Sequence, residues 1–191
     1  MSGVGWHDTL KIAGGLAALL LFIPMVCVIL RENGVGQSCA TWMLWGALDL
    51  TVTISIMEQH GNYLLPLGFT IGDSALVFLL IAKRQFRWTR FETVILLMVI
   101  GCFIGWEFSG PRIATITATL GICVAGVPGA VALWKHPQRR VGNIWLAYVG
   151  ANLLAFFGGT SMSIEERFAP GVFAFGALVM FVASRRSRAH E

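Results

Sequence analysis

Seven long apolar runs, separated by short polar stretches, account for almost the whole chain. An α-helix needs about 20 residues to cross a bilayer, and each run approaches or exceeds that length. The predicted spans are 9–30, 39–57, 63–83, 91–108, 111–134, 142–160 and 168–184. The loops leave no room for a soluble domain, so the pattern predicts an all-α membrane protein of seven transmembrane helices.

The composition agrees with a bilayer as the solvent. Of the 191 residues, 56% are hydrophobic and 13% are charged, and the mean hydropathy is +0.73. A soluble protein of this size needs a more polar surface. The first 30 residues lack the cationic start and the cleavage site of a signal peptide, which predicts a retained helix. Short loops and the lack of a recognisable sorting signal favour a bacterial inner membrane.

The distribution of Lys and Arg predicts the orientation. If the N-terminus lies outside, eleven of the fourteen cations face inward, and the positive-inside rule predicts N-out and C-in. Because most cations flank apolar segments, the net charge of +4 indicates topology rather than nucleic-acid binding. The inward cations are Arg31, Lys83, Arg84, Arg87, Arg90, Lys135, Arg139, Arg140, Arg185, Arg186 and Arg188.

Prolines, glycines and polar or aromatic positions recur at a nearly constant offset. Pairs 104 positions apart are Pro24 with Pro128, Pro66 with Pro170 and Gly72 with Gly176. Pairs 103 apart are Trp42 with Trp145, Trp45 with Tyr148 and Asp49 with Asn152. The offset predicts two copies of a three-helix unit, at 1–90 and 111–191, with a linker helix at 91–110. One extra crossing makes the copies parallel, an arrangement known in transporters.

The second predicted helix carries Trp42, Trp45 and Asp49 on one face, because they are spaced by three and four residues. Their counterparts share a face of the sixth helix. If the units pack about a pseudo-twofold axis, both faces converge near the middle of the membrane. Aromatic walls with a polar base suit a small polar, planar or ring-shaped solute. The alternative is that Trp42 and Trp145 belong to the aromatic belts of the membrane interface.

Two carboxyl groups inside apolar helices, Asp49 and Asp73, are the sharpest functional signal, because each costs about 2.5–3.5 kcal/mol on insertion scales. A protonated carboxyl permits proton coupling, and an ionised one binds a cationic solute. The structural alternative for Asp49 is a hydrogen bond with Thr53 or Asn152. The predicted substrate-binding residues are Trp42, Trp45, Asp49, Asp73, Trp145, Tyr148 and Asn152.

Pro24 and Pro128 each remove a backbone hydrogen bond from a predicted helix, which makes them candidate hinges. The four cysteines, Cys27, Cys39, Cys102 and Cys123, lack metal-like spacing and are predicted to be buried small hydrophobic residues. No phosphate loop, dinucleotide fingerprint or nucleophile–base pair occurs. The sequence therefore predicts no enzyme, cofactor or metal, and its partners are a small polar solute and the lipid bilayer. The sequence leaves open whether the chain forms a homo-oligomer.

The predicted arrangement resembles the SWEET sugar transporters and the related PnuC-type vitamin transporters. The matched prolines, the tryptophans of the second and sixth helices and the W-x-x-W from Trp42 to Trp45 carry the resemblance. It implies alternating access by rocking of one unit against the other. The chain lacks the proline–glutamine pair of the PQ-loop relatives, and Asp73 and Ala177 stand where SWEET proteins usually carry asparagine.

We therefore expect a transporter or facilitator of a sugar, a vitamin, a nucleoside-like molecule or an amine. The alternative is a scaffold or accessory subunit of a membrane complex that transports nothing itself. A retinal protein is excluded, because it needs a Schiff-base lysine in the last helix and no lysine follows Lys135.

Overall fold

The computed structural model describes residues 5–32, 39–86 and 88–185. The elements in these ranges are α1 (Trp6–Leu20), α2 (Phe22–Glu32), α3 (Cys39–Glu58), α4 (Leu64–Ala82), α5 (Arg90–Ser109), α6 (Pro111–Lys135), α7 (Arg139–Gly158), the π-helical segment η1 (Ile164–Phe168) and α8 (Ala169–Arg185). They form seven helices that are long and apolar enough to cross a membrane, with α1 and α2 in one span and η1 and α8 in another. The predicted all-α class with seven spans is confirmed.

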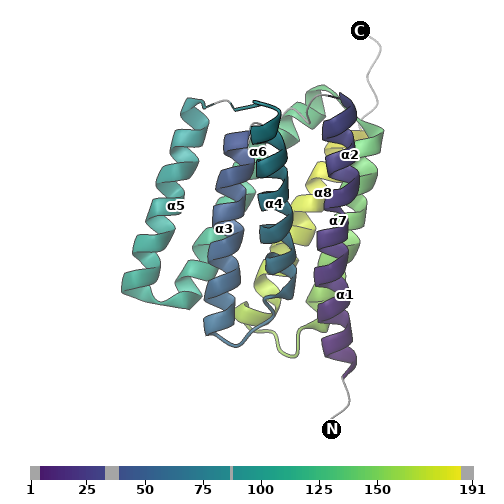
Figure 1. The fold of residues 1–191 in the computed structure, drawn as a ribbon. Coiled ribbons are helices and arrows are strands. Elements are labelled where there is room, and N and C mark those ends of the chain that lie inside the picture. The colour runs from purple at the N-terminus through teal and green to yellow at the C-terminus, as the bar shows by residue number, and fades with distance from the viewer. Residues whose placement is uncertain (1–4, 33–38, 87, 186–191) are drawn as a thin grey trace.

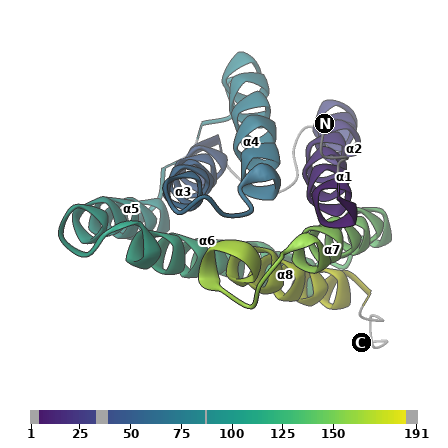
Figure 2. The same ribbon diagram turned by 90° about the horizontal axis from the view of Figure 1, so that it is seen from below.

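The seven spans run in alternating directions, so the two chain ends lie at opposite ends of the bundle (Figure 1). In the first half α4 packs between α1 and α3, and in the second half α8 packs between α6 and α7 (Figure 2). The halves meet where α1 packs on α7 and where α3 packs on α6. Exchanging the halves converts one interface into the other, as expected for a duplicated unit. The linker α5 packs on α6 and α3 at the edge of the bundle.

The two repeat-related prolines differ in their local effect. Pro24 cannot donate a backbone hydrogen bond to Leu20, and the first span is divided at Leu21 into α1 and α2. Pro128 lies inside α6, which is a single helix. The structure therefore has an interruption in the first unit without a matching one in the second. The hinge role of both prolines stays a prediction.

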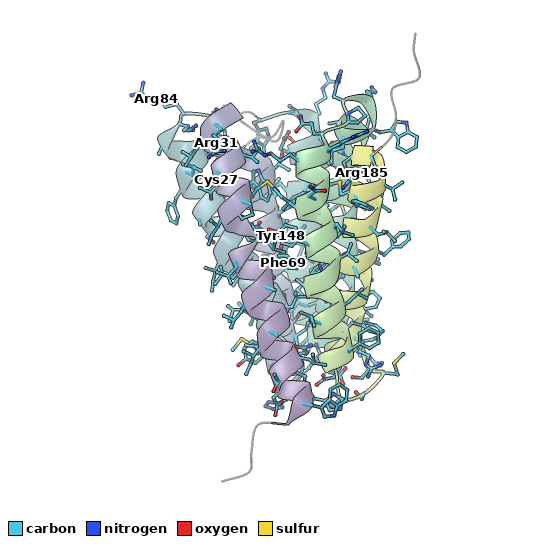
Figure 3. The ribbon with its side chains drawn as sticks, turned by 90° about the vertical axis from the view of Figure 1, so that its right-hand side faces the viewer. Cys27, Arg31, Phe69, Arg84, Tyr148 and Arg185 are labelled. Atoms are coloured by element: carbon cyan, nitrogen blue, oxygen red, sulfur yellow. The ribbon has the colours of Figure 1, made fainter. Side chains whose placement is uncertain are left out.

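The cations expected to face inward lie at one end of the bundle where the structure describes them. Figure 3 shows Arg31, Arg84 and Arg185 at the end of the bundle where α8 ends, with Phe69 and Tyr148 roughly midway. We call this end the basic end and the opposite one the N-terminal end. Three of the expected inward cations, at 87, 186 and 188, lie outside the described residues. Which end faces the cytoplasm stays a prediction.

The cysteine prediction is correct for two residues and wrong for Cys27. Cys39 and Cys102 are buried, and Cys123 is half-buried. Cys27 is exposed (Figure 3) because its position on α2 faces outward, whereas Val28 and Ile29 are buried. In a membrane helix an apolar thiol is equally stable against lipid, so hydropathy alone does not distinguish the two environments.

Candidate functional site

A cavity of about 290 Å³ lies between the two halves of the molecule. Its described lining comes from α2, α3 and α4 of the first half and from α6, α7 and α8 of the second. This volume is at the small end of the range of ligand pockets, which is about 300–1,000 Å³. All seven predicted substrate-binding residues line it: Trp42, Trp45, Asp49, Asp73, Trp145, Tyr148 and Asn152.

The positions of the lining residues along their helices indicate how deep in the cavity each one lies. Asp49 and Asp73 lie near the middle of α3 and α4. Trp42 and Trp145 lie closer to the first turns of α3 and α7, which begin at the basic end. The carboxyl groups therefore form the base of the cavity, and the tryptophans line the part that extends towards the basic end.

Aromatic rings from both halves meet in the cavity. The ring centroids of Phe69 on α4 and Phe173 on α8 lie 5.6 Å apart, in an edge-to-face arrangement at 78°. These residues are 104 positions apart, so each contacts its own repeat counterpart, which places the pair on the pseudo-twofold axis. Tyr148 lies 5.6 Å from Phe69 (Figure 3) and 5.6 Å from Trp145. Trp42 is only 3% exposed and lines the cavity, which does not fit a residue of an interfacial belt.

Unpaired polar atoms are concentrated in the cavity wall. Seven buried side-chain nitrogen or oxygen atoms lack a hydrogen-bond partner in the described part of the chain, and five of them belong to cavity residues. The five are Nε1 of Trp42, Trp45 and Trp145 and Oδ1 of Asp49 and Asn152. Buried polar atoms are normally paired, and an unpaired one costs about 1–3 kcal/mol. A ligand that offers both acceptors and donors would satisfy them.

The two carboxyl groups of the cavity contact each other. Asp49 and Asp73 are 4% and 2% exposed, and their side chains form a hydrogen bond with one another. This bond needs at least one proton, because an ionised carboxylate accepts hydrogen bonds and cannot donate one. With one proton, the pair carries one negative charge. None of the described lining residues is Lys, Arg or His, so the cavity wall supplies no cation to balance that charge.

The structural partners considered for Asp49 do not bind its carboxyl group. The Thr53 hydroxyl donates to the backbone oxygen of Asp49 at 2.8 Å. The Asn152 amide donates to the backbone oxygen of Tyr148 at 2.7 Å. Both are hydrogen bonds to a backbone carbonyl one helical turn earlier, so the carboxyl group of Asp49 is left facing Asp73 and the cavity.

An ion pair joins the two halves at the N-terminal end. Lys11 Nζ on α1 lies 2.9 Å from one carboxylate oxygen of Glu166 and 3.1 Å from the other. The two side chains are 15% and 9% exposed. Glu166 also accepts a hydrogen bond from the backbone N–H of Thr160 at 3.1 Å. Nearby, the Asn62 amide donates to the backbone oxygen of Ala155 at 2.9 Å.

Close helix packing also holds this end together. A Cβ added at Gly158 would lie 2.8 Å from the backbone nitrogen of Lys11, so α1 and α7 approach backbone to backbone. At the other interface, the Ser55 and Thr115 hydroxyls hydrogen-bond at 2.9 Å between α3 and α6. Thr115 is the counterpart of Lys11 at offset 104, and Ser55 is that of Gly158 at offset 103. Both unit interfaces are therefore packed at the N-terminal end.

No family model, curated protein or solved structure matches the chain. The site is therefore interpreted from its own residues. Three cavity aromatics were not predicted from the sequence: Phe22, Phe69 and Phe173. The offset of 104 that matched the prolines also pairs Phe69 with Phe173. Lys11 was not among the predicted site residues, although a charge inside an apolar helix is itself a functional signal.

Proposed function

We propose that the protein is a transporter of a small organic cation, an ammonium compound that also carries hydroxyl or carbonyl oxygens. The observation that supports this most strongly is the cavity between the two units, with its hydrogen-bonded pair of carboxyl groups and its unpaired polar atoms. This proposal narrows the solute classes expected from the sequence to the amines. A bacterial inner membrane is the location we propose.

The chemistry of the wall favours a cation over a neutral solute. The pair of Asp49 and Asp73 attracts a positive charge, and the faces of Trp and Tyr rings bind ammonium groups through their quadrupoles. The indole N–H groups, which have no partner among the described residues, would donate to oxygens of the same solute. A carboxylate in this cavity would face like charge with no Lys or Arg among the described lining residues.

The packing of the two ends supports transport by alternating access. The halves are locked at the N-terminal end by the pair Lys11–Glu166 and by backbone-close helix packing. At the basic end, the described contacts include two within single units: Lys83 donates to Ile29, and Arg185 to Asn143. A rocking motion that opens the first end and closes the second would expose the cavity alternately. The SWEET-like resemblance agrees with such a cycle.

Uptake into proteoliposomes tests the proposal with a matched pair of solutes. Glucosamine and glucose share a ring and differ by an ammonium group in place of one hydroxyl. We expect saturable uptake of radiolabelled glucosamine or choline that exceeds glucose uptake and empty-liposome controls. Asp49→Asn keeps the shape of the side chain and should abolish the preference for the amine.

Two outcomes would contradict the proposal. Glucose uptake equal to that of glucosamine would indicate a cavity that binds sugars without a preference for a cation. If neither amine enters and neither raises the melting temperature of the purified protein, transport of amines fails, and copurification with a stable partner would favour a scaffold.

A further inference from the structure

The duplication is broken at one position of the cavity wall. Phe22 on α2 and Gly72 on α4 correspond, at the offset of 104, to Gly126 on α6 and Gly176 on α8. In the first unit the Phe22 ring lies directly on Gly72, where an added Cβ would come within 2.1 Å of the ring. The ring is 6% exposed, so it fills the space between α2 and α4.

In the second unit no ring occupies the corresponding place. A Cβ added at Gly176 would meet no heavy atom within 4 Å. One added at Gly126 would meet its nearest heavy atoms, from Met180 and Trp45, at 3.8 Å, an ordinary contact distance. Both glycines line the cavity, on two helices that pack against each other. The seam between α6 and α8 is therefore open where the seam between α2 and α4 is filled.

The open seam reaches the outer surface of the bundle. Among the described lining residues, the exposed side chains are those of Val127, Phe175 and Val179, at 53%, 67% and 42%. All three belong to α6 or α8, and they lie near or just past the middle of their spans. A helix face at this depth contacts the hydrocarbon of the bilayer rather than water. By contrast, Phe22 and Met25 on α2 are buried.

We infer that the seam between α6 and α8 is a lateral portal, through which an amphiphilic amine reaches the cavity from the bilayer. This rests on the proposed function and narrows its substrate class. The ammonium group lies at Asp49 and Asp73, and an aliphatic tail extends past Gly126 and Gly176 into lipid. A cavity of about 290 Å³ leaves little space for a long tail beside the headgroup, whereas the portal has an apolar lining.

Photocrosslinking tests the portal without requiring transport. The probe is a ten-carbon chain with a trimethylammonium group at one end and a diazirine midway along the chain, where the tail passes Gly126, and its matched control has a neutral alcohol headgroup. Reconstituted protein is irradiated, and labelled residues are identified by mass spectrometry. We expect labelling of the buried residues Trp45 and Met180, which lie beside Gly126, in addition to the lipid-exposed Phe175.

Gly126→Phe places the ring of the first unit at the equivalent position in the second. It should abolish labelling of Trp45 and Met180 and leave labelling of Phe175 intact. Gly176→Leu fills the portal from the other helix and should have the same effect on labelling as Gly126→Phe. Gly150→Phe is the matched control, because Gly150 is exposed and an added Cβ there would meet nothing within 4 Å. It should leave the labelling unchanged.

The outcomes separate the portal from the proposed function. Two results would overturn the portal. One is labelling confined to exposed residues in the unmodified protein, and the other is labelling of Trp45 that persists in both Gly126→Phe and Gly176→Leu. If the amine and the alcohol label Trp45 equally, and Asp49→Asn reduces neither, the portal holds and the preference for a cation fails. Loss of amine labelling alone in Asp49→Asn supports both.

Discussion

Replacing Glu166 with glutamine should release the N-terminal end of the bundle. The change removes one charge of the pair Lys11–Glu166, whose oxygens lie 2.9 and 3.1 Å from the lysine nitrogen. An exposed ion pair contributes about 0–1 kcal/mol, and removal of one partner from a buried pair costs about 3–5 kcal/mol. This pair is 15% and 9% exposed, and glutamine still accepts a hydrogen bond, so we place the effect near 2 kcal/mol, between those limits.

An effect of about 2 kcal/mol corresponds to roughly a 30-fold change in an equilibrium constant. If the pair stabilises the state closed at the N-terminal end, Glu166→Gln should shift the population by about that factor towards the state open there. The pair Lys11–Glu166 joins α1 to η1, which belong to different units, so its loss favours separation of the units.

Cys123 is a natural reporter for this shift, because it lines the cavity and is half-buried. Cys27→Ser, Cys39→Ala and Cys102→Ala leave it as the single thiol of the chain. A charged, membrane-impermeant methanethiosulfonate is then applied to vesicles of either orientation. We expect labelling mainly from the basic end in the parent, and increased labelling from the N-terminal end in Glu166→Gln.

Glu165→Gln is the matched control, since it removes the neighbouring carboxylate and leaves the pair Lys11–Glu166 intact. It should label like the parent. If Glu166→Gln lowers the melting temperature but leaves the sidedness of labelling unchanged, the ion pair stabilises the fold without closing the cavity at the N-terminal end.

Three further predictions concern the cavity and the unit interface. Gly158→Leu should lower the melting temperature by an amount equivalent to about 1–3 kcal/mol, because its Cβ would lie 2.8 Å from the backbone nitrogen of Lys11; Gly150→Leu, at an open position, should not, and equal shifts would contradict the close packing. Trp45→Phe removes an indole N–H that has no partner among the described residues, so calorimetry should show amine binding weakened by about fivefold, worth about 1 kcal/mol; unchanged amine affinity would contradict a role of this N–H in binding. Asp73→Asn should reduce glucosamine uptake as strongly as Asp49→Asn, because the two carboxyl groups share one charge; uptake that depends on Asp49 alone would contradict the shared site.

The number and type of helices could be predicted because apolar run length is set directly by bilayer thickness. The predicted helix boundaries were less accurate where the first residues of a helix are charged. The sixth span starts at Arg139 instead of 142, because long cationic side chains extend towards water while their backbone stays helical. The seventh includes η1, whose residues Glu165 to Arg167 lower the hydropathy that a sequence window detects.

The convergence of the seven predicted residues followed from one assumption, a duplicated unit with its polar face turned inward. The phenylalanines of the cavity could not be distinguished in this way, because an apolar ring is equally acceptable towards lipid. Phe22 and Phe78 are both phenylalanines in apolar helices, yet Phe22 is 6% exposed and Phe78 is 73% exposed. The contact of Asp49 with Asp73 depends on how α3 packs on α4, which spacing along one helix does not specify.

Calorimetric titration of the protein in nanodiscs with choline and with its neutral isostere 3,3-dimethylbutan-1-ol tests for a cation site between the two units. A desolvated cation–π contact contributes about 2 kcal/mol, so choline should bind about 30-fold more tightly than the isostere. The difference should disappear in the double variant Asp49→Asn/Asp73→Asn. Equal affinity for both ligands, or unchanged choline affinity in the double variant, would contradict a cation site between the two units.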